Sequence, residues 1–450
     1  MTTTVNLRQT SDIESIRPMR IHLKTLGCRL NEAELETWSR DFHNLGHQIT
    51  SRLEEADLVV VNTCAVTGEA VRKSRKLLSQ AQRKNPRSKL IVSGCYASLN
   101  PAENIQSLGV DLVIDNRDKD RLVEITAREL DLHAMPEQAT TPGEISLLSR
   151  GRQRAFIKVQ DGCRYQCTFC IVTVARGQER SRPIAQIIDE IKLNQDQGIQ
   201  EIVLTGVHLG GYGSDSGSDL SKLIRAILDQ TDIERVRLGV VEPWDLPKNF
   251  WTLFENSRLM PHLHLPIQSG SNTVLKRMAR RCKQEEFTRL VNEARSRVDN
   301  LNLTTDIIVG FPGETKEEWQ QTIDYVQQIG FGHMHIFAYS QRLGTRAAIL
   351  PNPVSREIIR ARSEQLHQIG EMMKQEILSS YVDKEFPVLI ESAPTAPDAF
   401  WSGYTPNFLR VEINHPIEDD LENRIIPVKL LQLSKSGDTL MGSLLEEQRS

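Results

Sequence analysis

Three cysteines with a C-x₃-C-x₂-C spacing, Cys163, Cys167 and Cys170, are the strongest chemical feature of the sequence. Three thiolates on one loop can hold three corners of a cubane [4Fe-4S] cluster, because soft sulfur ligands favour such clusters. The fourth iron would have no protein ligand, so a substrate or cofactor could bind to it directly. Zinc, which usually takes four N or S ligands, and three unrelated buried thiols are the alternatives.

A second group of cysteines, Cys28, Cys64 and Cys95, is spread along the N-terminal part of the chain. Each follows a predicted strand by a residue or two, and the carboxyl ends of parallel strands share one edge, where ligands bind. The three thiols should therefore converge on a shared metal site, with Gly27 and Gly94 allowing the backbone to approach closely. Three small hydrophobic residues at strand ends are the alternative.

The N-terminal part alternates short β-branched runs with amphipathic helices, which is the pattern of a parallel α/β sheet. The expected strands are 21–26, 58–62, 90–93 and 112–115, and the expected helices are 31–45, 66–83 and 119–130. The second group of cysteines would then lie at the carboxyl edge of this sheet.

A longer βα series follows and predicts an open (β/α)₆ partial barrel, with active residues on loops at the carboxyl ends of the strands. Its expected strands are 155–160, 201–204, 235–238, 262–265, 302–308 and 333–337. A long helix over 355–381 leads to strand-like runs at 387–391, 409–413 and 425–431, which predict a small β-barrel. We therefore expect an α/β protein with a polar, disordered tail (1–18), a parallel-sheet domain (19–132), a linker (133–149), a partial barrel (150–380) and a β domain (381–447).

Composition restricts the class of protein. The chain has 450 residues, a formal net charge of −4, 39% hydrophobic and 25% charged residues, as in a globular protein with a sizeable core. No apolar run approaches the roughly 20 residues that a membrane span needs, and the N-terminus lacks the apolar stretch of a signal peptide. Seven cysteines, an odd number, indicate a reducing cytoplasm rather than a disulfide framework. We expect a cytoplasmic protein without membrane contact.

Over nearly its full length the sequence resembles the radical S-adenosylmethionine (SAM) methylthiotransferases. The resemblance rests on TLGCRLNEAE (25–34), VVNTCAVTGEAVRKSRK (60–76), VSGCYA (92–97), IKVQDGCRYQCTFCIVTVARGQERSR (157–182), LTGVHLGGYG (204–213), LHLPIQSGSNTVLKRMAR (263–280) and TDIIVGFPGET (305–315). It implies an N-terminal methylthiotransferase domain, a radical SAM barrel and a C-terminal TRAM-like β-barrel.

The resemblance also implies the cofactors and the reaction. SAM would bind the open iron of the cluster held by Cys163, Cys167 and Cys170, and a second [4Fe-4S] cluster, held by Cys28, Cys64 and Cys95, would carry or donate sulfur. The residues of these motifs are similar to those of the branch that adds a methylthio group to carbon 2 of N(6)-threonylcarbamoyladenosine, next to the anticodon of tRNA. The implied partners are tRNA, an electron donor such as flavodoxin or ferredoxin, and a sulfur source.

Two sets of further site residues are expected. Barrel strand ends offer SAM contacts at Thr205, Gly206, His208, Glu242, Gln268, Ser269 and Gly310, although glycine there has a steric explanation and His208 and His264 could be satisfied polar residues. Basic residues placed to grip tRNA phosphates are Arg72, Lys73, Arg75, Lys76 and Arg176, for which a solvated surface is the alternative.

Two other functions stay open at this point. The same chemistry on isopentenyl-adenosine tRNA or on a ribosomal protein would need a different substrate pocket. A noncatalytic iron–sulfur protein that binds RNA would keep the cysteines without cleaving SAM.

Overall fold

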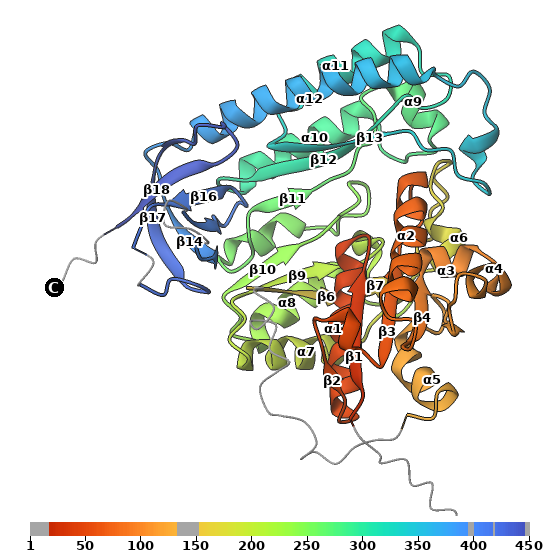
Figure 1. Ribbon diagram of the computed structural model, residues 1–450. Coiled ribbons are helices and arrows are strands. Elements are labelled where there is room, and N and C mark those ends of the chain that lie inside the picture. Colours follow the sequence, from red (N-terminus) through yellow and green to blue (C-terminus); the bar gives the residue numbers. More distant parts are fainter. Residues whose placement is uncertain (1–17, 133–152, 395–399, 417–418, 446–450) are drawn as a thin grey trace, which may run out of the picture.

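The computed structural model describes residues 18–132, 153–394, 400–416 and 419–445 (Figure 1). The linker expected over 133–149, and all but the last residue of the tail expected over 1–18, lie outside this part. The N-terminal sheet lies beside the barrel strands, and the C-terminal barrel lies at the far end of the molecule (Figure 1).

The N-terminal part is a parallel five-stranded sheet with the order β2-β1-β3-β4-β5. Its strands are β1 (Arg20–Thr25), β2 (Gln48–Ile49), β3 (Leu58–Thr63), β4 (Lys89–Gly94) and β5 (Leu112–Val113). Its helices are α1 (Arg29–Asn44), η1 (Leu53–Glu55), α2 (Gly68–Lys84), α3 (Cys95–Leu99), α4 (Ala102–Gln106), η2 (Lys119–Arg121) and α5 (Leu122–Glu129).

Central strand β3 is buried along its whole length because helices cover both faces of the sheet. Val60 packs on one side in a core with Trp38 of α1, whereas Val61 packs on the other side in a core with Leu78 of α2. Alternate side chains of a strand point to opposite faces, so a continuous apolar run suits this position.

The central part is an open barrel of six parallel strands. Two three-stranded sheets, β6-β9-β10 and β11-β12-β13, are joined through a bridge between Val240 and His264. The strands are β6 (Arg154–Lys158), β9 (Glu201–Thr205), β10 (Arg235–Leu238), β11 (His262–His264), β12 (Asn302–Val309) and β13 (His333–Ala338). Between β6 and β9 a short hairpin is formed by β7 (Gln160–Asp161) and β8 (Arg180–Ser181).

The helices of the central part lie between and after these strands along the chain. They are α6 (Val172–Arg176), α7 (Ile184–Asp196), η5 (Leu209–Gly211), α8 (Leu220–Gln230), η6 (Phe250–Glu255), α9 (Asn272–Arg277), α10 (Gln284–Arg297), α11 (Lys316–Ile329), η7 (Arg346–Ile349) and α12 (Arg356–Ser379). Helix α1 of the N-terminal part packs against β6, at the edge of the open barrel.

The C-terminal part is a closed barrel with the order β14-β15-β16-β18-β17. Its strands are β14 (Glu385–Ser392), β15 (Trp401–Tyr404), β16 (Arg410–Ile413), β17 (Ile425–Leu433) and β18 (Leu440–Leu444). The expected fold class is thus confirmed in all three parts. The sequence analysis missed β15 and β18, which are short and contain glycine, a residue that weakens a strand pattern.

Buried charges join the C-terminal barrel to the amino ends of the central strands. Arg237 pairs with Glu201 at 2.8 Å and donates to the backbone oxygen of Pro406 at 2.9 Å. Burial alone would raise the pKa of Glu201, but Arg237 and its arginine neighbours lower it to about 2. The ring of Phe408 lies 4.7 Å from the guanidinium groups of both Arg154 and Arg237, so the C-terminal part is docked through cation–π contacts as well.

Among the described residues, no helix has the length and apolar character that crossing a bilayer requires.

Candidate active site

The first cysteine group lies on the loop between β7 and α6. The thiols of Cys163 and Cys170 each accept a backbone N–H at 3.4 Å, from Tyr165 and Val172, and the amide of Cys170 donates to the oxygen of Cys167 at 3.0 Å. The loop is thus folded back on itself, and its three thiols face a common region at the carboxyl end of the barrel.

These thiols are better suited to bind a metal cluster than to act as free nucleophiles. Burial and the neighbouring Cys167 raise the pKa of Cys163 to about 11 and that of Cys170 to about 12. Thiols with raised pKa values are poor nucleophiles at neutral pH and lose their protons when a metal binds. Three soft donors with mutual electrostatic coupling therefore fit a cluster with three protein ligands.

Arg280 joins this loop to a predicted SAM contact. Its guanidinium donates to Sγ of Cys167 at 3.7 Å and to Glu242 at 2.9 Å, and it stacks over Trp244 at 4.3 Å. The arginine and the carboxylate of Glu242 are thus both beside the cysteine loop. Glu242 was predicted from the sequence, whereas Arg280 was not, because its place in a basic run gave no sign of a thiol partner.

The second group also comes together, as the strand pattern predicts. Cys64 and Cys95 directly follow β3 and β4, and Cys28 lies three residues after the end of β1. Burial raises the pKa of the Cys64 thiol, and the neighbouring Cys95 and Cys28 raise it further. Gly27 has φ +128°, and a Cβ there would lie 2.9 Å from Cβ of Cys64, so only glycine allows this approach. Cys28 is exposed, whereas Cys64 and Cys95 are buried.

Hydrogen bonds fix the loops of the second group. The hydroxyl of Ser74 donates to the oxygen of Cys64 at 2.8 Å and accepts from its amide at 3.2 Å. The side-chain amide of Asn116 donates to Sγ of Cys95 at 3.8 Å and to the oxygen of Ala175 at 2.8 Å. Because Ala175 belongs to α6, Asn116 connects the second cysteine group to the helix that follows the first.

Arg176, on the same helix, is buried rather than exposed to a phosphate, so its expected contact with tRNA is corrected here. Its guanidinium binds Glu34 and Asp161, each at 3.0 Å, and Asn31 at 2.7 Å. Burial alone would lower the pKa of Arg176, but the charges of Glu34 and Asp161 raise it well above the usual range. Arg176 therefore ties the first cysteine loop to the second.

Two lysines complete this buried network. Lys119 lies 2.5 Å from Glu34, and Lys158 lies 3.0 Å from Asp161. Burial alone would raise the pKa of Glu34, but Arg176, Lys119 and Lys158 lower it to about 2. This network could not be predicted from the sequence, because its members come from five separate elements and form no local motif.

His208 is held between two carboxylates rather than left open to a ligand. Its Nδ1 bonds to Glu179, and its Nε2 lies 2.7 Å from Asp245, which also accepts from the hydroxyl of Tyr165 at 2.9 Å. Burial would lower the pKa of His208, but both carboxylates raise it. Since Tyr165 belongs to the cysteine loop, His208 supports that loop, and the geometry does not favour a direct SAM contact.

The other expected SAM residues line the strand ends in different ways. Thr205 is buried at the end of β9, and a Cβ on Gly206 would lie 2.9 Å from Oε1 of Gln160. A Cβ on Gly310 would lie 2.3 Å from Ile359 of α12, so packing alone requires this glycine.

Gln268 and Ser269 follow β11, and Gln268 forms an isolated parallel bridge with Ile307 of β12. Gln268 has φ +79°, an uncommon conformation for a residue with a side chain. Its backbone N–H donates to the backbone oxygen of Asp306 at 2.9 Å. The hydroxyl of Ser269 is fully buried and lies 3.3 Å from that of Thr322. SAM contacts at these positions stay predictions.

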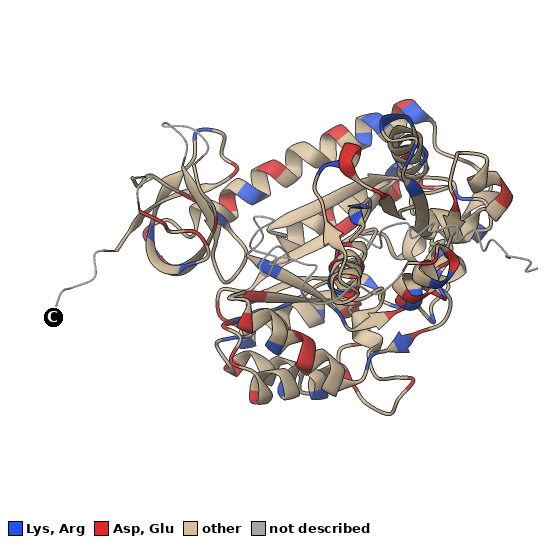
Figure 2. Ribbon diagram, turned by 60° about the horizontal axis from the view of Figure 1, so that its bottom comes forward, with Lys and Arg blue, Asp and Glu red and all other residues tan. Residues whose placement is uncertain are grey.

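The expected tRNA contacts on α2 are exposed. Arg72, Lys73, Arg75 and Lys76 all lie on the solvent side of the helix, and Lys73 pairs with Glu69 at 2.7 Å. Acidic and basic residues are interspersed over much of the molecule in the view of Figure 2, whereas the 18 residues from Arg72 to Lys89 contain eight basic residues and no acidic one. A role in binding RNA stays a prediction.

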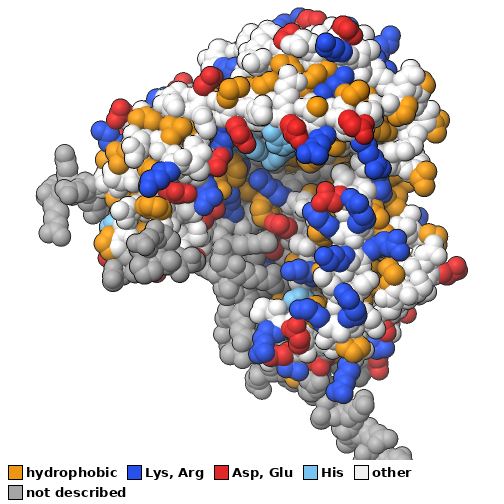
Figure 3. Space-filling model, turned by 45° about the horizontal axis from the view of Figure 1, so that its top comes forward, with side chains coloured by type: hydrophobic (Ala, Val, Ile, Leu, Met, Phe, Trp, Pro, Cys, Tyr) orange, Lys and Arg blue, Asp and Glu red, His pale blue; other side chains and the backbone are white. Residues whose placement is uncertain are grey.

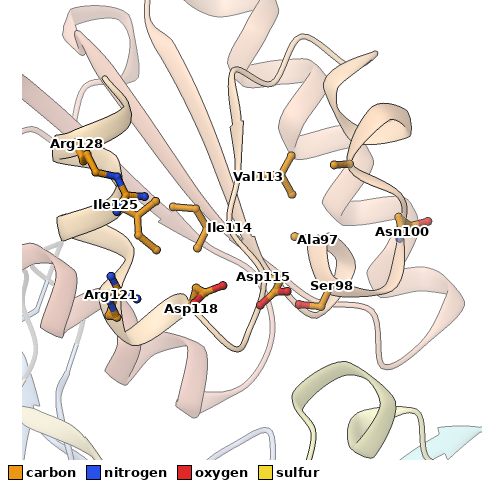
Figure 4. Close-up of a pocket in the computed structure, with 11 residues that line it drawn as sticks. Ala97, Ser98, Asn100, Val113, Ile114, Asp115, Asp118, Arg121, Ile125 and Arg128 are labelled. Atoms are coloured by element: carbon orange, nitrogen blue, oxygen red, sulfur yellow. The ribbon is translucent and has the colours of Figure 1, made fainter. Parts of the chain in front are cut away.

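A pocket in the N-terminal part is separate from the cysteines. Arg121 of η2 and Arg128 of α5 lie on one side of it and Ser98 and Asn100 on the other, with Asp115 between them (Figure 4). None of the described residues that line it is a cysteine, and Arg121 is paired with Glu124 at 2.9 Å. We assign the chemistry to the cysteine loops instead.

Comparisons with known proteins agree with this placement. The radical SAM superfamily matches residues 157–326, and an uncharacterized protein family, UPF0004, matches residues 20–115. Among solved structures, the radical SAM methyltransferase TsrM from Kitasatospora setae is similar in fold, with a TM-score of 0.57 at 16% identity over 74% of this chain and 77% of that one.

Curated relatives match over most of their length. The threonylcarbamoyladenosine tRNA methylthiotransferase MtaB of Bacillus subtilis is 34% identical over 91% of this chain and 93% of its own. A tRNA-2-methylthio-N(6)-dimethylallyladenosine synthase of Alkaliphilus oremlandii is 32% identical over 94% of this chain and 92% of its own. This chain belongs to the MtaB-like radical SAM methylthiotransferases, enzymes that use a [4Fe-4S] cluster and SAM.

Proposed function

We propose that this protein adds a methylthio group to carbon 2 of N(6)-threonylcarbamoyladenosine, next to the anticodon of tRNA. The observation that carries the proposal is the joining of two cysteine groups through Arg176 and Asn116, in a chain 34% identical to relatives named for this reaction. Such a reaction needs both a radical source and a sulfur carrier within reach of one base.

The residues of the chain divide this work. Cys163, Cys167 and Cys170 would hold the cluster that binds SAM, and Cys28, Cys64 and Cys95 a second one. The clusters would supply the electron that cleaves SAM and the site at which sulfur is carried. The C2–H bond of adenine has no acidic proton, so side chains of the protein position the reactants rather than exchange protons with the base.

Binding of tRNA would use surfaces outside the cysteine loops. The exposed basic side chains Arg72, Lys73, Arg75 and Lys76 of α2 follow Cys64 in the chain and could neutralise phosphates near the anticodon. The reaction would take place in the cytoplasm, with flavodoxin or ferredoxin as reductant and a separate sulfur source.

A deletion strain tests the substrate. Digested tRNA from the strain should lack 2-methylthio-N(6)-threonylcarbamoyladenosine, and a plasmid copy of the gene should restore it. Loss of the dimethylallyl nucleoside instead would identify the alternative tRNA substrate, and unchanged tRNA would point to a ribosomal protein. For the noncatalytic alternative, reduced and reconstituted protein incubated with SAM would form no 5′-deoxyadenosine.

A further inference from the structure

One face of strands β11, β12 and β13 carries polar side chains toward the inside of the barrel. His264 pairs with Thr304 in the sheet, and Asp306 pairs with His335 on the next strand. Residues that are neighbours across parallel strands share a face, whereas residues between them, such as Leu303, are buried in the core behind the sheet. Figure 3 shows a hollow in this side of the molecule, with histidine side chains gathered on its wall.

The groups on this wall are partly committed to one another. His264 lies 3.1 Å from Asp306 through Nε2 and 2.9 Å from the hydroxyl of Thr304 through Nδ1. His335 is exposed, its ring lies 5.4 Å from that of His264, and none of the described residues hydrogen-bonds to either of its ring nitrogens. The wall therefore has one fixed histidine and one with free hydrogen-bonding capacity.

A basic residue from the N-terminal part faces the same hollow. Arg29 directly follows Cys28, is exposed, and has its guanidinium 5.7 Å from the ring of Phe156 in β6. The same guanidinium lies 5.8 Å from the ring of Phe408, which lies 5.0 Å from the ring of His262 on β11. Nε2 of His262 lies 3.3 Å from the hydroxyl of Thr304, the group that Nδ1 of His264 also contacts. Arg29 therefore approaches the wall that carries His264, Asp306 and His335, and its charge, with burial and His264, lowers the pKa of His335 against the effect of Asp306.

We propose that Arg29, His335 and Asp306 form the pocket for the substituent on N6 of the substrate adenine, and that they select a polar substituent with a carboxylate. This inference rests on the proposed function. Carbon 2 and the N6 substituent belong to the same ring, so an adenine whose carbon 2 is near Cys28 places its substituent near the residue that follows.

The three side chains match the chemistry of a threonylcarbamoyl group. The guanidinium of Arg29 can bind its carboxylate through two parallel N–H donors. His335 can donate to its carbonyl or hydroxyl oxygen, and Asp306 can accept from its urea N–H. A dimethylallyl group would remove water from these polar groups and offer no hydrogen bonds in return, and a site built for hydrogen bonds rejects such a substrate strongly.

A divalent cation is the competing occupant of the same side chains. Ligand atoms of His264, Asp306 and His335 all lie within 4.8 Å of one another, a spacing that a metal ion could bridge. The charge of Arg29 acts on this group and disfavours a further cation, whereas it favours an anionic organic group. We therefore favour the substituent over the metal.

The test compares His335→Leu and Arg29→Leu with the conservative variants His335→Gln and Arg29→Lys, and with His367→Leu on the exposed side of α12 as a control. Anticodon stem-loops that carry threonylcarbamoyladenosine, dimethylallyladenosine or plain adenosine serve as probes. Dissociation constants are measured by fluorescence anisotropy, and KM, kcat and SAM cleavage are measured with anaerobically reconstituted protein.

We expect each leucine variant to raise Kd and KM for the threonylcarbamoyl probe by about tenfold or more, with plain adenosine unaffected and SAM cleavage retained. The conservative variants should recover part of the loss, and the control should match the wild type. If the ratio of Kd for the threonylcarbamoyl probe to Kd for the plain adenosine probe is the same in the wild type and the leucine variants, the proposed pocket is wrong. The proposal is also overturned if the wild type binds one further equivalent of metal ion that His335→Leu does not bind. A wild type that modifies only the dimethylallyl probe would instead refute the proposed function.

Discussion

Nη2 of Arg176 donates a hydrogen bond to Oδ1 of Asn31 at 2.7 Å, and this contact joins the two cysteine loops. Asn31 in turn donates to the backbone oxygen of Leu26, two residues before Cys28, at 2.8 Å, and to that of Thr63, directly before Cys64, at 3.3 Å. Arg176 lies on α6, which follows Cys170. One buried guanidinium thus sets the spacing between the two proposed clusters.

Replacing Arg176 with methionine should destabilise the protein and should separate SAM cleavage from formation of the methylthio product. Two buried carboxylates would lose a partner, at a cost of about 3–5 kcal/mol, which a shift of the urea unfolding midpoint would report. SAM cleavage should persist while methylthio product falls, because the first loop keeps its own contacts. The partly exposed Arg180, 3.7 Å from Asp161, provides the matched control Arg180→Met, with an expected loss below about 1 kcal/mol. If Arg176→Met forms as much methylthio product per SAM cleaved as the wild type does, Arg176 does not position the two cysteine loops.

The buried Glu34 should make stability depend on pH in the acidic range. Its pKa of about 2 is below the 4.5 of an ordinary glutamate, so the unfolded chain binds the proton more tightly. The resulting stabilisation, about 3 kcal/mol, is fully present above about pH 4.5 and is lost as the pH falls toward 2. Unfolding midpoints of wild type and Glu34→Gln should therefore converge as the pH falls below 4.5. A gap that stays constant would show that Glu34 does not titrate this way.

Replacing Cys64 with alanine should separate the roles of the two cysteine groups. Iron and sulfide per chain should fall by about half after anaerobic reconstitution, because one of two four-iron sites is lost. SAM cleavage should continue, whereas methylthio product should disappear. Cys282→Ser is the matched control, since Cys282 is a buried cysteine of the barrel core and belongs to neither group. Normal product from Cys64→Ala would refute a role for the second group.

Much of this fold could be predicted from sequence because its central strands are buried on both faces. A continuous apolar run such as Leu58–Thr63, bounded by turn residues, locates a parallel strand within a residue or two. The same strand pattern is enough to place Cys28, Cys64 and Cys95 at one edge of the sheet, because parallel strands end on the same side.

The rest depends on partners that are distant in the chain. Arg176 belongs to a basic run that resembles a surface, yet its acid partner Glu34 is 142 residues away. His264, Asp306 and His335 come from three strands with long helical connections between them, so no spacing in the sequence indicates their convergence. Burial and register, which only the folded chain supplies, reveal both groups.

Truncating Phe408 should loosen the C-terminal barrel. Its ring stacks on Tyr404 at 4.7 Å and lies 4.7 Å from the guanidinium of Arg237. Phe408→Ala removes these contacts and should lower the stability of the docked C-terminal barrel by about 1–3 kcal/mol. Proteases should then cleave the C-terminal part sooner, and the first thermal unfolding transition should occur at a lower temperature. The exposed Phe400 gives the control Phe400→Ala, which should behave as wild type. Equal protease resistance of the two variants would contradict docking through Phe408.

The basic face of α2 should contribute to tRNA affinity through charge rather than through base contacts. Replacing Arg72 and Arg75 with glutamine removes two exposed cations that form no ion pair within the described residues, without disturbing the buried Ser74 between them. Affinity for tRNA should fall, and the slope of log Kd against log salt should decrease by about 1 for each lost phosphate contact. Arg360→Gln on α12, where the side chain is 82% exposed, is the matched surface control and should leave the slope unchanged. Because contacts with phosphates do not depend on the base, the double variant should bind tRNAs with and without the substrate base more weakly by the same factor. An unchanged salt slope in the double variant would place the phosphate contacts elsewhere on the protein.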